Sequence, residues 1–457
     1  MGTTPVDDAP DRVLVRLRRT DEARRLDQEI VLLALPTLAT LVSEPLLLLA
    51  DSAIVGHLGT DQLAGLGIAA NVLGVLTGLS IFLAYATTGT VARRLGAGDR
   101  ASALSGGFDG LVLAVGLGLL LAVALELALP VVVGAYGATP GVTAAASTYL
   151  RVAALGLPSV LLLLAGTGVL RGLQDTRTPL VVVVAANLVN IGLNLALVYG
   201  AGLGIAGSAL GTLVAQSGAA LAVALVVLRR MRAAHARPGL RPRGVLAAAR
   251  AGSWLVVRTA TLQAAVTLTT VVATTAGTVG LAAHQVVNSL WVLLAFALDA
   301  IAIAGQSIIG RALGAGEVAR GRAMTRRMVG WGVAAGLVSG LVVWAARPLY
   351  VGLFSPDPGV QALVGAVLLV VALVTPVAGV VYVLDGVLIG AGDSRYLALA
   401  GLVALACYAP LALLVHEQRA GLVWLWAAYG GFMLARLVTL GLRTRTDRWV
   451  RVGALAG

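Results

Sequence analysis

Long apolar stretches, separated by short polar connections, occupy almost the whole chain. Each stretch has about 20 or more residues, the length that an α-helix needs to cross a hydrocarbon layer about 30 Å thick. The pattern predicts an all-α polytopic membrane protein. Its twelve expected transmembrane helices lie at roughly 30–56, 63–92, 105–133, 142–168, 180–200, 203–228, 246–276, 281–310, 323–346, 361–389, 397–415 and 421–442.

The second half of the chain repeats the first half at a constant offset of 218 residues. Segment 93–99 recurs as 311–317, and segment 169–177 recurs as 387–395. A repeat of six spans returns the chain to the side of the membrane from which it started, so both halves have the same orientation. Two similar bundles that face one another form a cleft that can open to either side, as alternating access requires.

The duplication and the polar stretches divide the chain into five parts. We expect a cytoplasmic N-terminal tail (1–29), an N-lobe with spans one to six (30–228), a cytoplasmic linker (229–250), a C-lobe with spans seven to twelve (251–442) and a cytoplasmic C-terminal tail (443–457).

Composition and charge agree with a membrane protein. Hydrophobic residues make up 59% of the chain and charged residues 12%, whereas a soluble domain has about 25% charged residues. All 33 basic residues are arginine, and nearly all lie in the tails and in alternate connections. The opposite connections hold only Arg347 and Arg419, with Arg151 near that surface. This asymmetry predicts that both termini are cytoplasmic, and it argues against binding of nucleic acid.

Residues 1–29 are polar and contain no separate apolar core, so we expect no cleavable signal. Cys407 is the single cysteine and lies inside a predicted span, where we expect it to be buried. One cysteine and four scattered histidines argue against a metal centre, a cofactor and a membrane enzyme.

Four polar residues are expected to meet in the outer half of the N-lobe. A charged side chain deep in a membrane costs at least about 2.5–3.5 kcal/mol. Asp51 in the first span is therefore expected to have a functional or structural role. Asn190 and Asn194 share one face of the fifth span, and Asn194 lies at a depth similar to that of Asp51. Thr212 of the sixth span lies within one to two helical turns of that level. The spacing predicts a cluster of oxygen-bearing side chains.

Asp51 is the only clear charge of this cluster, so burial would favour its neutral form and let it exchange a proton near neutral pH. Proton coupling is therefore favoured, and sodium, which prefers more oxygen charge, remains open. The structural alternatives are a helix-packing hydrogen bond for Asp51 and interhelical hydrogen bonding for Asn187, Asn190 and Asn194. Glu44, seven residues before Asp51, is expected on the same helix face, looking into the lobe. It is either a second proton relay or a partner of backbone groups freed by Pro45.

The C-lobe offers a second acidic residue, Asp299, near the middle of span eight. It either contacts substrate or protons or belongs to a structural ion pair, for which Arg258 is a possible partner. Asp385 lies close to the inner surface, where we expect it to anchor the fold, and His284 is expected to be an interfacial histidine with its hydrogen bonds made. The residues expected to line the substrate cleft are Asp299, Arg258, Asn187, Gln263, Gln285, Asn288 and Gln306.

Several motifs, in this order and spacing, resemble the multidrug and toxic compound extrusion (MATE) family, most closely its DNA-damage-inducible (DinF-like) branch. They cover about residues 28–442 and include the Glu44-Pro45 pair and the segments 51–59, 63–67, 93–99, 171–177, 204–209 and 311–317. The resemblance implies a monomeric antiporter of twelve spans that exports small organic or cationic compounds, xenobiotics among them, in exchange for protons or sodium.

In that family the corner of Asp51, Asn190, Asn194 and Thr212 is the cation site, although several relatives have Asp at the position of Asn194. The Gly-Ala-Gly-acid blocks and the acidic residues Asp175 and Asp393 are expected to cap helices and to form inner gates through ion pairs. The alternative function is a flippase-type exporter of a lipid-linked or amphipathic metabolite. Such a flippase is expected to have about fourteen spans, so a count of twelve disfavours it.

Overall fold

The computed structural model describes residues 9–454, and the side chains of residues 23–454. This part of the chain contains twelve helical segments that are long and apolar enough to cross a membrane, and it contains no strand. The prediction of an all-α membrane protein with twelve spans is confirmed.

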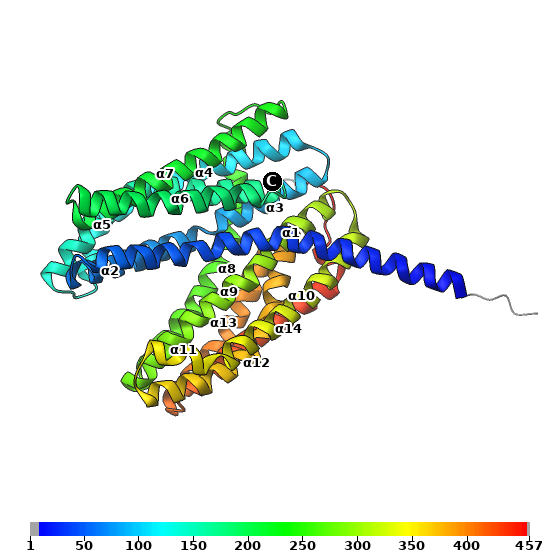
Figure 1. Cartoon of the computed structure of the whole chain (residues 1–457). Coiled ribbons are helices and arrows are strands. Elements are labelled where there is room, and N and C mark those ends of the chain that lie inside the picture. Colours follow the sequence, from blue (N-terminus) through cyan, green and yellow to red (C-terminus); the bar gives the residue numbers. More distant parts are fainter. Residues whose placement is uncertain (1–8, 455–457) are drawn as a thin grey trace, which may run out of the picture.

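The first six spans form the N-lobe and the last six form the C-lobe (Figure 1). The elements of the N-lobe are α1 (Ala9–Gly56), α2 (Thr60–Ser80), α3 (Phe82–Gly96), α4 (Arg100–Gly134), α5 (Pro140–Gly172), α6 (Arg177–Leu195), the π-helical turn η1 (Ala196–Gly200) and α7 (Gly204–Ala233). Those of the C-lobe are α8 (Pro242–Thr274), α9 (Gly277–Gly314), α10 (Val318–Ala345), α11 (Arg347–Phe354), α12 (Pro358–Gly390), α13 (Ser394–Glu417), α14 (Leu422–Arg445) and the short 3₁₀ helix η2 (Asp447–Trp449).

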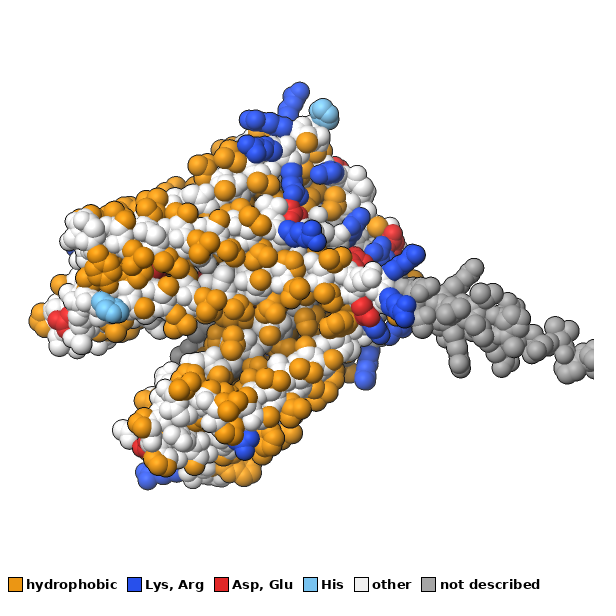
Figure 2. Space-filling view, viewed as in Figure 1, with side chains coloured by type: hydrophobic (Ala, Val, Ile, Leu, Met, Phe, Trp, Pro, Cys, Tyr) orange, Lys and Arg blue, Asp and Glu red, His pale blue; other side chains and the backbone are white. Residues whose placement is uncertain are grey.

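The two lobes form a V that is closed at one end and open at the other (Figure 1). The space-filling view shows the gap between the lobes, and apolar side chains cover the outer surface of both (Figure 2). Arginines gather at the closed end, whereas few lie at the open ends (Figure 2). An apolar exterior with charges restricted to the ends is the surface that a lipid bilayer requires.

Both lobes pack in the same way, as the 218-residue repeat predicts. Gly118 of α4 leaves room for the backbone of Pro158 on α5, because a Cβ atom at this position would overlap Pro158 Cα. Gly336 of α10 leaves the same room for Pro376 of α12. Each pair is separated from its counterpart by the repeat offset, so the duplicated sequence specifies a duplicated helix contact.

The repeat also marks where the lobes meet. At Gly96 of α3 a Cβ atom would overlap the carbonyl oxygen of Arg311 on α9, and at Gly314 of α9 a Cβ atom would overlap that of Arg93 on α3. The two contacts are reciprocal, so a pseudo-two-fold axis passes between α3 and α9 at the closed end of the V. Two glycines allow the backbones to approach there, as small residues do between membrane helices.

Some boundaries differ from the prediction. Helix α1 begins at Ala9, so residues 9–29 continue the first span as helix, while residues 1–8 lie outside the described part. Helix α7 continues to Ala233 and α8 begins at Pro242, which shortens the linker. Arginine and alanine are good helix formers, so helices extend beyond the apolar segment. The second span is divided at Ile81, whose N–H bonds Gly78 O, three residues back instead of four.

Cys407 corrects one expectation, because its side chain is exposed. It lies within α13, a membrane-spanning helix whose neighbours are α8 and α14. Cys407 therefore lies on a face of α13 that the neighbouring helices leave uncovered. Hydropathy alone does not distinguish a lipid-facing position from a buried one.

Candidate functional site

The four polar residues predicted for the N-lobe meet in the structure. Asn194 of α6 donates from Nδ2 to Asp51 Oδ1 of α1 at 2.6 Å and to Asn190 Oδ1 at 2.9 Å. Asn190 in turn donates from Nδ2 to Thr212 Oγ1 of α7 at 2.9 Å. Asp51 is 5% exposed and Asn194 is 0% exposed. A chain of hydrogen bonds therefore joins three helices around one buried carboxyl group, and we call these four residues the acidic corner.

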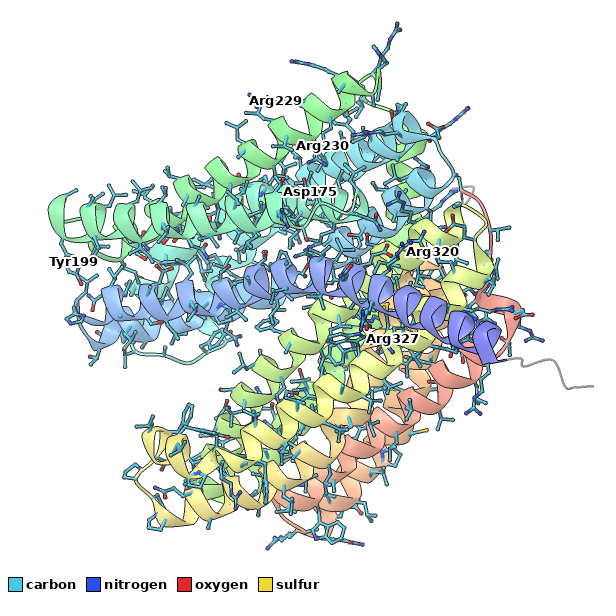
Figure 3. The ribbon with its side chains drawn as sticks, turned by 45° about the vertical axis from the view of Figure 1, so that its right-hand side comes forward. Asp175, Tyr199, Arg229, Arg230, Arg320 and Arg327 are labelled. Atoms are coloured by element: carbon cyan, nitrogen blue, oxygen red, sulfur yellow. The ribbon has the colours of Figure 1, made fainter. Side chains whose placement is uncertain are left out.

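Local backbone features bring α6 close to its neighbours here. Gly211 of α7 has no side chain to displace Asn194, whose Oδ1 would overlap a Cβ atom at that position. Immediately after α6 the chain forms the π-helical turn Ala196–Gly200, a feature that often occurs near functional sites. In this turn Tyr199, labelled in Figure 3, donates from its hydroxyl group to Ile54 O at 2.6 Å and ties the turn to α1.

The acidic corner has spare capacity to accept hydrogen bonds or a cation. No ion pair to Asp51 is found among the described side chains. Asn194 Oδ1 and Ser208 Oγ are buried and have no hydrogen-bond partner. Buried polar atoms without a partner are uncommon and call for an explanation. A proton on the carboxyl group, or a small cation among these oxygens, fits the chemistry of the corner.

Sequence reasoning missed two members of this environment, Tyr149 and Ser208. Tyr149 of α5 is buried and lies beside Ser208 and Thr212 of α7. Ser208 belongs to segment 204–209, which the sequence singled out as a family motif rather than as part of a site. Tyr149 had no sequence signal, because an isolated tyrosine in a helix is ordinary and only the packing of α5 against α7 brings it near.

The C-lobe counterpart of the acidic corner carries no charge. At the repeat offset, Thr269 stands for Asp51 and Tyr408 stands for Asn190. Thr269 Oγ1 and the Tyr408 hydroxyl group share a hydrogen bond of 2.5 Å. The Tyr408 ring also packs against Tyr429 and Phe432, with ring centroids 5.9 and 5.8 Å apart. Aromatic packing thus occupies the place where the N-lobe has its carboxyl group.

Glu44 and Asp51, seven residues apart on α1, differ in their burial. Glu44 is exposed, whereas Asp51 is buried. The two residues share a helix face by spacing, but burial depends on the neighbouring helices, and α6 covers Asp51. Asn187, half-buried on α6, donates from Nδ2 to the carbonyl oxygen of Ser43 at 3.1 Å. This bond links α6 to α1 one turn below the acidic corner.

The possible ion pair between Arg258 and Asp299 is not formed. Arg258 of α8 donates to Asp385 of α12 at 2.6 Å, and Arg436 of α14 donates to the same carboxylate. Arg258 lies at the midpoint of α8, and its long side chain reaches Asp385 on α12. The half-buried Asp299 instead accepts a hydrogen bond of 3.1 Å from the Tyr85 hydroxyl group. This contact crosses from α9 of the C-lobe to α3 of the N-lobe.

The remaining polar candidates are dispersed. Gln306 is 1% exposed and donates from Nε2 to the Tyr85 carbonyl oxygen, so it joins the lobes. Gln263 and Gln285 are exposed, and Asn288 is half-buried. His284 is buried, with Nε2 3.1 Å from Thr270 Oγ1, but Nδ1 has no partner. The expectation that both its nitrogens are satisfied is therefore wrong for Nδ1.

Ion pairs at the closed end hold each lobe together, which corrects the expectation that Asp175 and Asp393 form gates. Asp175 pairs with Arg230 of the same lobe (Figure 3), and Asp393 pairs with Arg443 of its own lobe at 2.6 Å. The helix-capping part of the expectation holds for Asp175, which accepts from Thr178 N at 3.0 Å at the start of α6. Asp99 likewise accepts from Ser102 N at the start of α4.

Ion pairs between spans of opposite lobes come from α1 instead. Asp27 accepts from Arg327 Nε at 2.6 Å and from Trp331 Nε1 at 2.7 Å, and Arg320 pairs with Glu29 at 3.0 Å. Arg320 and Arg327 belong to α10 and lie beside α1 at the closed end (Figure 3). The first half of α1 is thus fastened to the C-lobe, while its second half carries Asp51 in the N-lobe.

Burial by itself raises the pKa of Asp175, which lies in the connection between two spans. The hydrogen bonds from Thr178 and the charge and hydrogen bond of Arg230 outweigh this effect, and the pKa of the carboxyl group falls below its ordinary value. Asp175 is therefore ionised at neutral pH and attaches α6 to the last turns of α7.

Two duplicated lobes of six spans, with a gap between them and a buried acid in one lobe, define a membrane protein with the architecture of a secondary transporter. The MatE family model matches residues 36–196 and 256–414, more than half of the chain. The chain therefore belongs to the MatE family.

Known relatives match most of the chain. Protein DETOXIFICATION 44, chloroplastic, of Arabidopsis thaliana is 30% identical over 93% of this chain and 84% of its own length. DNA damage-inducible protein F of Escherichia coli (strain K12) is 30% identical over 80% of this chain and 81% of its own. The Vibrio cholerae MATE transporter VcmN, in a crystal structure of its bent form, has the same fold with a TM-score of 0.85 at 22% identity, covering 94% of this chain and 99% of that one.

Proposed function

We propose that this protein is a multidrug efflux antiporter that exports small organic compounds, cations among them, in exchange for inward-moving protons. It acts as a monomer in a bacterial plasma membrane, with both termini in the cytoplasm, and not as an enzyme or a nucleic-acid-binding protein. Membership of the MatE family supports export, and the V of two lobes supports alternating access. The coupling ion is inferred from the acidic corner.

The distribution of arginine supports an orientation. The closed end of the V carries the arginine-rich connections, and the positive-inside rule assigns that end to the cytoplasm. The cleft then opens outward, and the conformation described here is outward-facing. In this state the inner contacts include the Gly96–Arg311 and Gly314–Arg93 approaches and the Tyr85–Asp299 hydrogen bond.

The transport cycle is then as follows. Outward-facing protein with substrate bound takes up a proton at Asp51, which removes the negative charge that Asn194 stabilises. Helix α1 shifts, with Pro36 or Pro45 as the hinge, since proline interrupts helix hydrogen bonds. Substrate leaves, the lobes turn inward, and the proton passes to the cytoplasm before new substrate binds. Coupling requires that proton and substrate favour different states of the protein.

One observation carries the proposal: Asp51 is buried among amide and hydroxyl groups, with no ion pair found among the described side chains. A carboxyl group fixed by an arginine would stay ionised, as Asp385 does between two arginines, whereas Asp51 is free to change its charge. Sodium coupling is the weaker option, because a single carboxylate supplies little negative charge for a bound cation.

Substrate-dependent pH changes in sealed vesicles test the proposal. Vesicles containing the protein are loaded with a pH-sensitive dye and exposed to ethidium, with and without sodium. We expect ethidium to drive proton movement without sodium, and Asp51→Asn to abolish it while the protein remains folded. Asp61→Asn, at an exposed acid near the open end, is the matched control and should behave like the unmodified protein. Full transport by Asp51→Asn would refute the assignment.

A further inference from the structure

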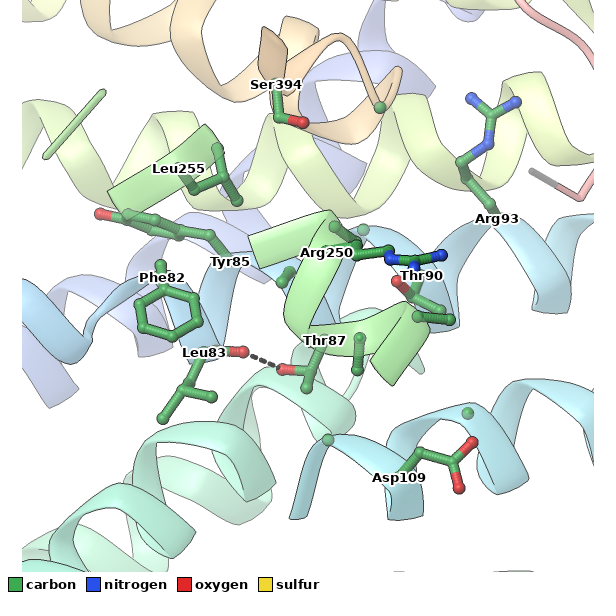
Figure 4. Close-up of a pocket in the computed structure, with 18 of the residues that line it drawn as sticks. Phe82, Leu83, Tyr85, Thr87, Thr90, Arg93, Asp109, Arg250, Leu255 and Ser394 are labelled. Carbon is green, nitrogen blue, oxygen red and sulfur yellow. Dashed lines mark hydrogen bonds between the residues drawn. The ribbon is translucent and has the colours of Figure 1, made fainter. Parts of the chain in front are cut away.

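A cavity of about 330 Å³ lies at the closed end of the V, apart from the acidic corner (Figure 4). It is lined by α3 and α4 of the N-lobe and by α8 of the C-lobe, and Ser394 at the start of α13 also contributes. Both lobes therefore supply its walls. None of the four residues of the acidic corner lines this cavity, although Tyr85 and Arg93 of the inner contacts do.

The charge of this interlobe cavity is strongly positive. Arg94, Arg250 and Arg451 line it, and Arg250 lies beside Thr90 in Figure 4. Arg250 is exposed and has no hydrogen bond or ion pair among the described side chains, while Arg94 donates only to the Ser102 carbonyl oxygen, at 3.2 Å. At least two guanidinium groups thus retain free donors for an anion.

A second, independent observation is the buried Arg93, which also lines the cavity. It is 2% exposed, and its guanidinium group donates only to backbone carbonyl oxygens, those of Ala391, Arg451 and Gly453. Its Nε has no partner. No carboxylate among the described side chains balances this charge, although a buried cation usually has an anionic partner.

The acidic residue in the cavity wall does not supply the missing charge. Asp109 accepts from Arg241 Nε at 3.1 Å and from Arg241 Nη2 at 2.7 Å, which is the bidentate geometry of a strong arginine–carboxylate pair. Its negative charge is already neutralised by an arginine outside the lining. The cavity therefore presents an excess of positive charge that an anion can balance.

The polarity of the lining changes with depth in the membrane. The apolar part is formed by Phe82, Leu113 and Leu255, and the basic part by Arg94 and Arg250. Phe82 and Arg94 both lie on α3, twelve residues apart. At the rise of an α-helix, Arg94 is therefore about 18 Å nearer the closed end than Phe82. A lipid of the adjacent leaflet has the same polarity, with an anionic headgroup at the membrane surface and acyl chains below it.

We propose that the interlobe cavity binds a phosphate group carried by an anionic membrane lipid, with the headgroup at Arg94 and Arg250 and an acyl chain along Phe82, Leu113 and Leu255. The lipid is a resident ligand that contacts both lobes, not cargo for export. A lipid headgroup and free phosphate both present a phosphate anion, which arginine binds well. This inference concerns binding at the closed end and does not rest on the antiport mechanism.

Binding to the purified full-length protein in a neutral detergent tests the proposal. Native mass spectrometry counts bound lipid, and thermal denaturation measures stabilisation, with added phosphatidylglycerol, phosphatidylcholine or sodium phosphate at matched ionic strength. We expect phosphatidylglycerol to bind and stabilise more than phosphatidylcholine. Removing two of the cavity's charges in Arg94→Gln/Arg250→Gln should weaken phosphatidylglycerol binding at least about tenfold, since each arginine near an anionic headgroup contributes about 1 kcal/mol.

Two further variants separate this site from general charge attraction. Arg229→Gln/Arg232→Gln removes the same number of exposed charges beyond the cavity and should leave binding unchanged. Ala251→Phe fills the cavity without changing charge and should also weaken binding. If sodium phosphate stabilises the protein as much as phosphatidylglycerol does, and this effect is lost in Arg94→Gln/Arg250→Gln, the cavity binds phosphate but its source is the free ion and not a lipid. Equal binding of both lipids, or retained binding in both cavity variants, overturns the proposal.

Discussion

Asn194 Nδ2 lies 2.6 Å from Asp51 Oδ1 and joins two helices that are 143 residues apart in sequence. The amide supplies a hydrogen-bond donor to the carboxylate without adding a formal charge. This distinguishes the acidic corner from the buried ion pairs of the C-lobe, where Asp385 is held by two arginines. The charge of the residue at position 194 should therefore decide which cation the corner accepts.

Replacing this amide by a carboxylate tests that idea. In Asn194→Asp the corner gains a second acidic group beside Asp51, and hard cations such as sodium bind where carboxylate oxygens accumulate. We expect the variant to acquire ethidium transport that rises severalfold on addition of sodium at constant pH, measured by fluorescence in vesicles. Asn187→Asp, on the same helix but bonded to Ser43, is the control and should gain no sodium dependence. An Asn194→Asp variant that ignores sodium would argue against a cation site here.

The buried carboxylate of Asp385 should be important for stability. In Asp385→Asn, Arg258 and Arg436 lose their common anionic partner inside the protein, and breaking such a buried pair costs about 3–5 kcal/mol. We expect a clear drop in the thermal unfolding midpoint in detergent. Asp447→Asn removes a surface pair with Arg322, both exposed, and should leave the midpoint unchanged. Equal midpoints for the two variants would contradict the anchoring role.

The close backbone contacts of Gly96 and Gly314 between the lobes should control whether the closed end of the V can form. A Cβ atom in Gly314→Ala would overlap the Arg93 backbone, which cannot move aside as a flexible side chain could. We expect faster maleimide labelling of a Ser307→Cys reporter, 2% exposed at the lobe interface, in a Cys407→Ala background. Gly330→Ala is the control, because open space surrounds Gly330. Unchanged labelling in Gly314→Ala would show that the lobes do not close through this contact.

Asp175 provides a pH-dependent prediction outside the spans. Its pKa is below the ordinary value in the folded protein, so its ionised form stabilises the fold above the unfolded pKa of about 3.9. This contribution decreases as the pH falls through the folded pKa. We expect Asp175→Asn to lower the unfolding midpoint at pH 7, and this difference to shrink as the pH falls below the unfolded pKa and through the lower folded pKa. A difference that persists at low pH would mean that packing, not charge, is responsible.

The architecture of this protein follows from its amino-acid sequence. Apolar length fixed the twelve spans, because hydrocarbon thickness sets the length of a crossing helix. The 218-residue repeat fixed the equivalence of the lobes, which reappears in the paired contacts of Gly118 with Pro158 and of Gly336 with Pro376. Helical periodicity together with span depth was enough to bring Asp51, Asn190, Asn194 and Thr212 to one corner of the N-lobe.

The partners of the other polar residues depend on how the helices pack in three dimensions. Arg258 pairs with Asp385 and not with Asp299, and both Glu44 and Cys407 are exposed. Span depth and helix face do not fix these outcomes, because they depend on which neighbouring helix covers each face and on how far a long side chain reaches. The interlobe cavity likewise arises from helices of both lobes, so its combined charge becomes apparent only when α3, α4 and α8 are packed together.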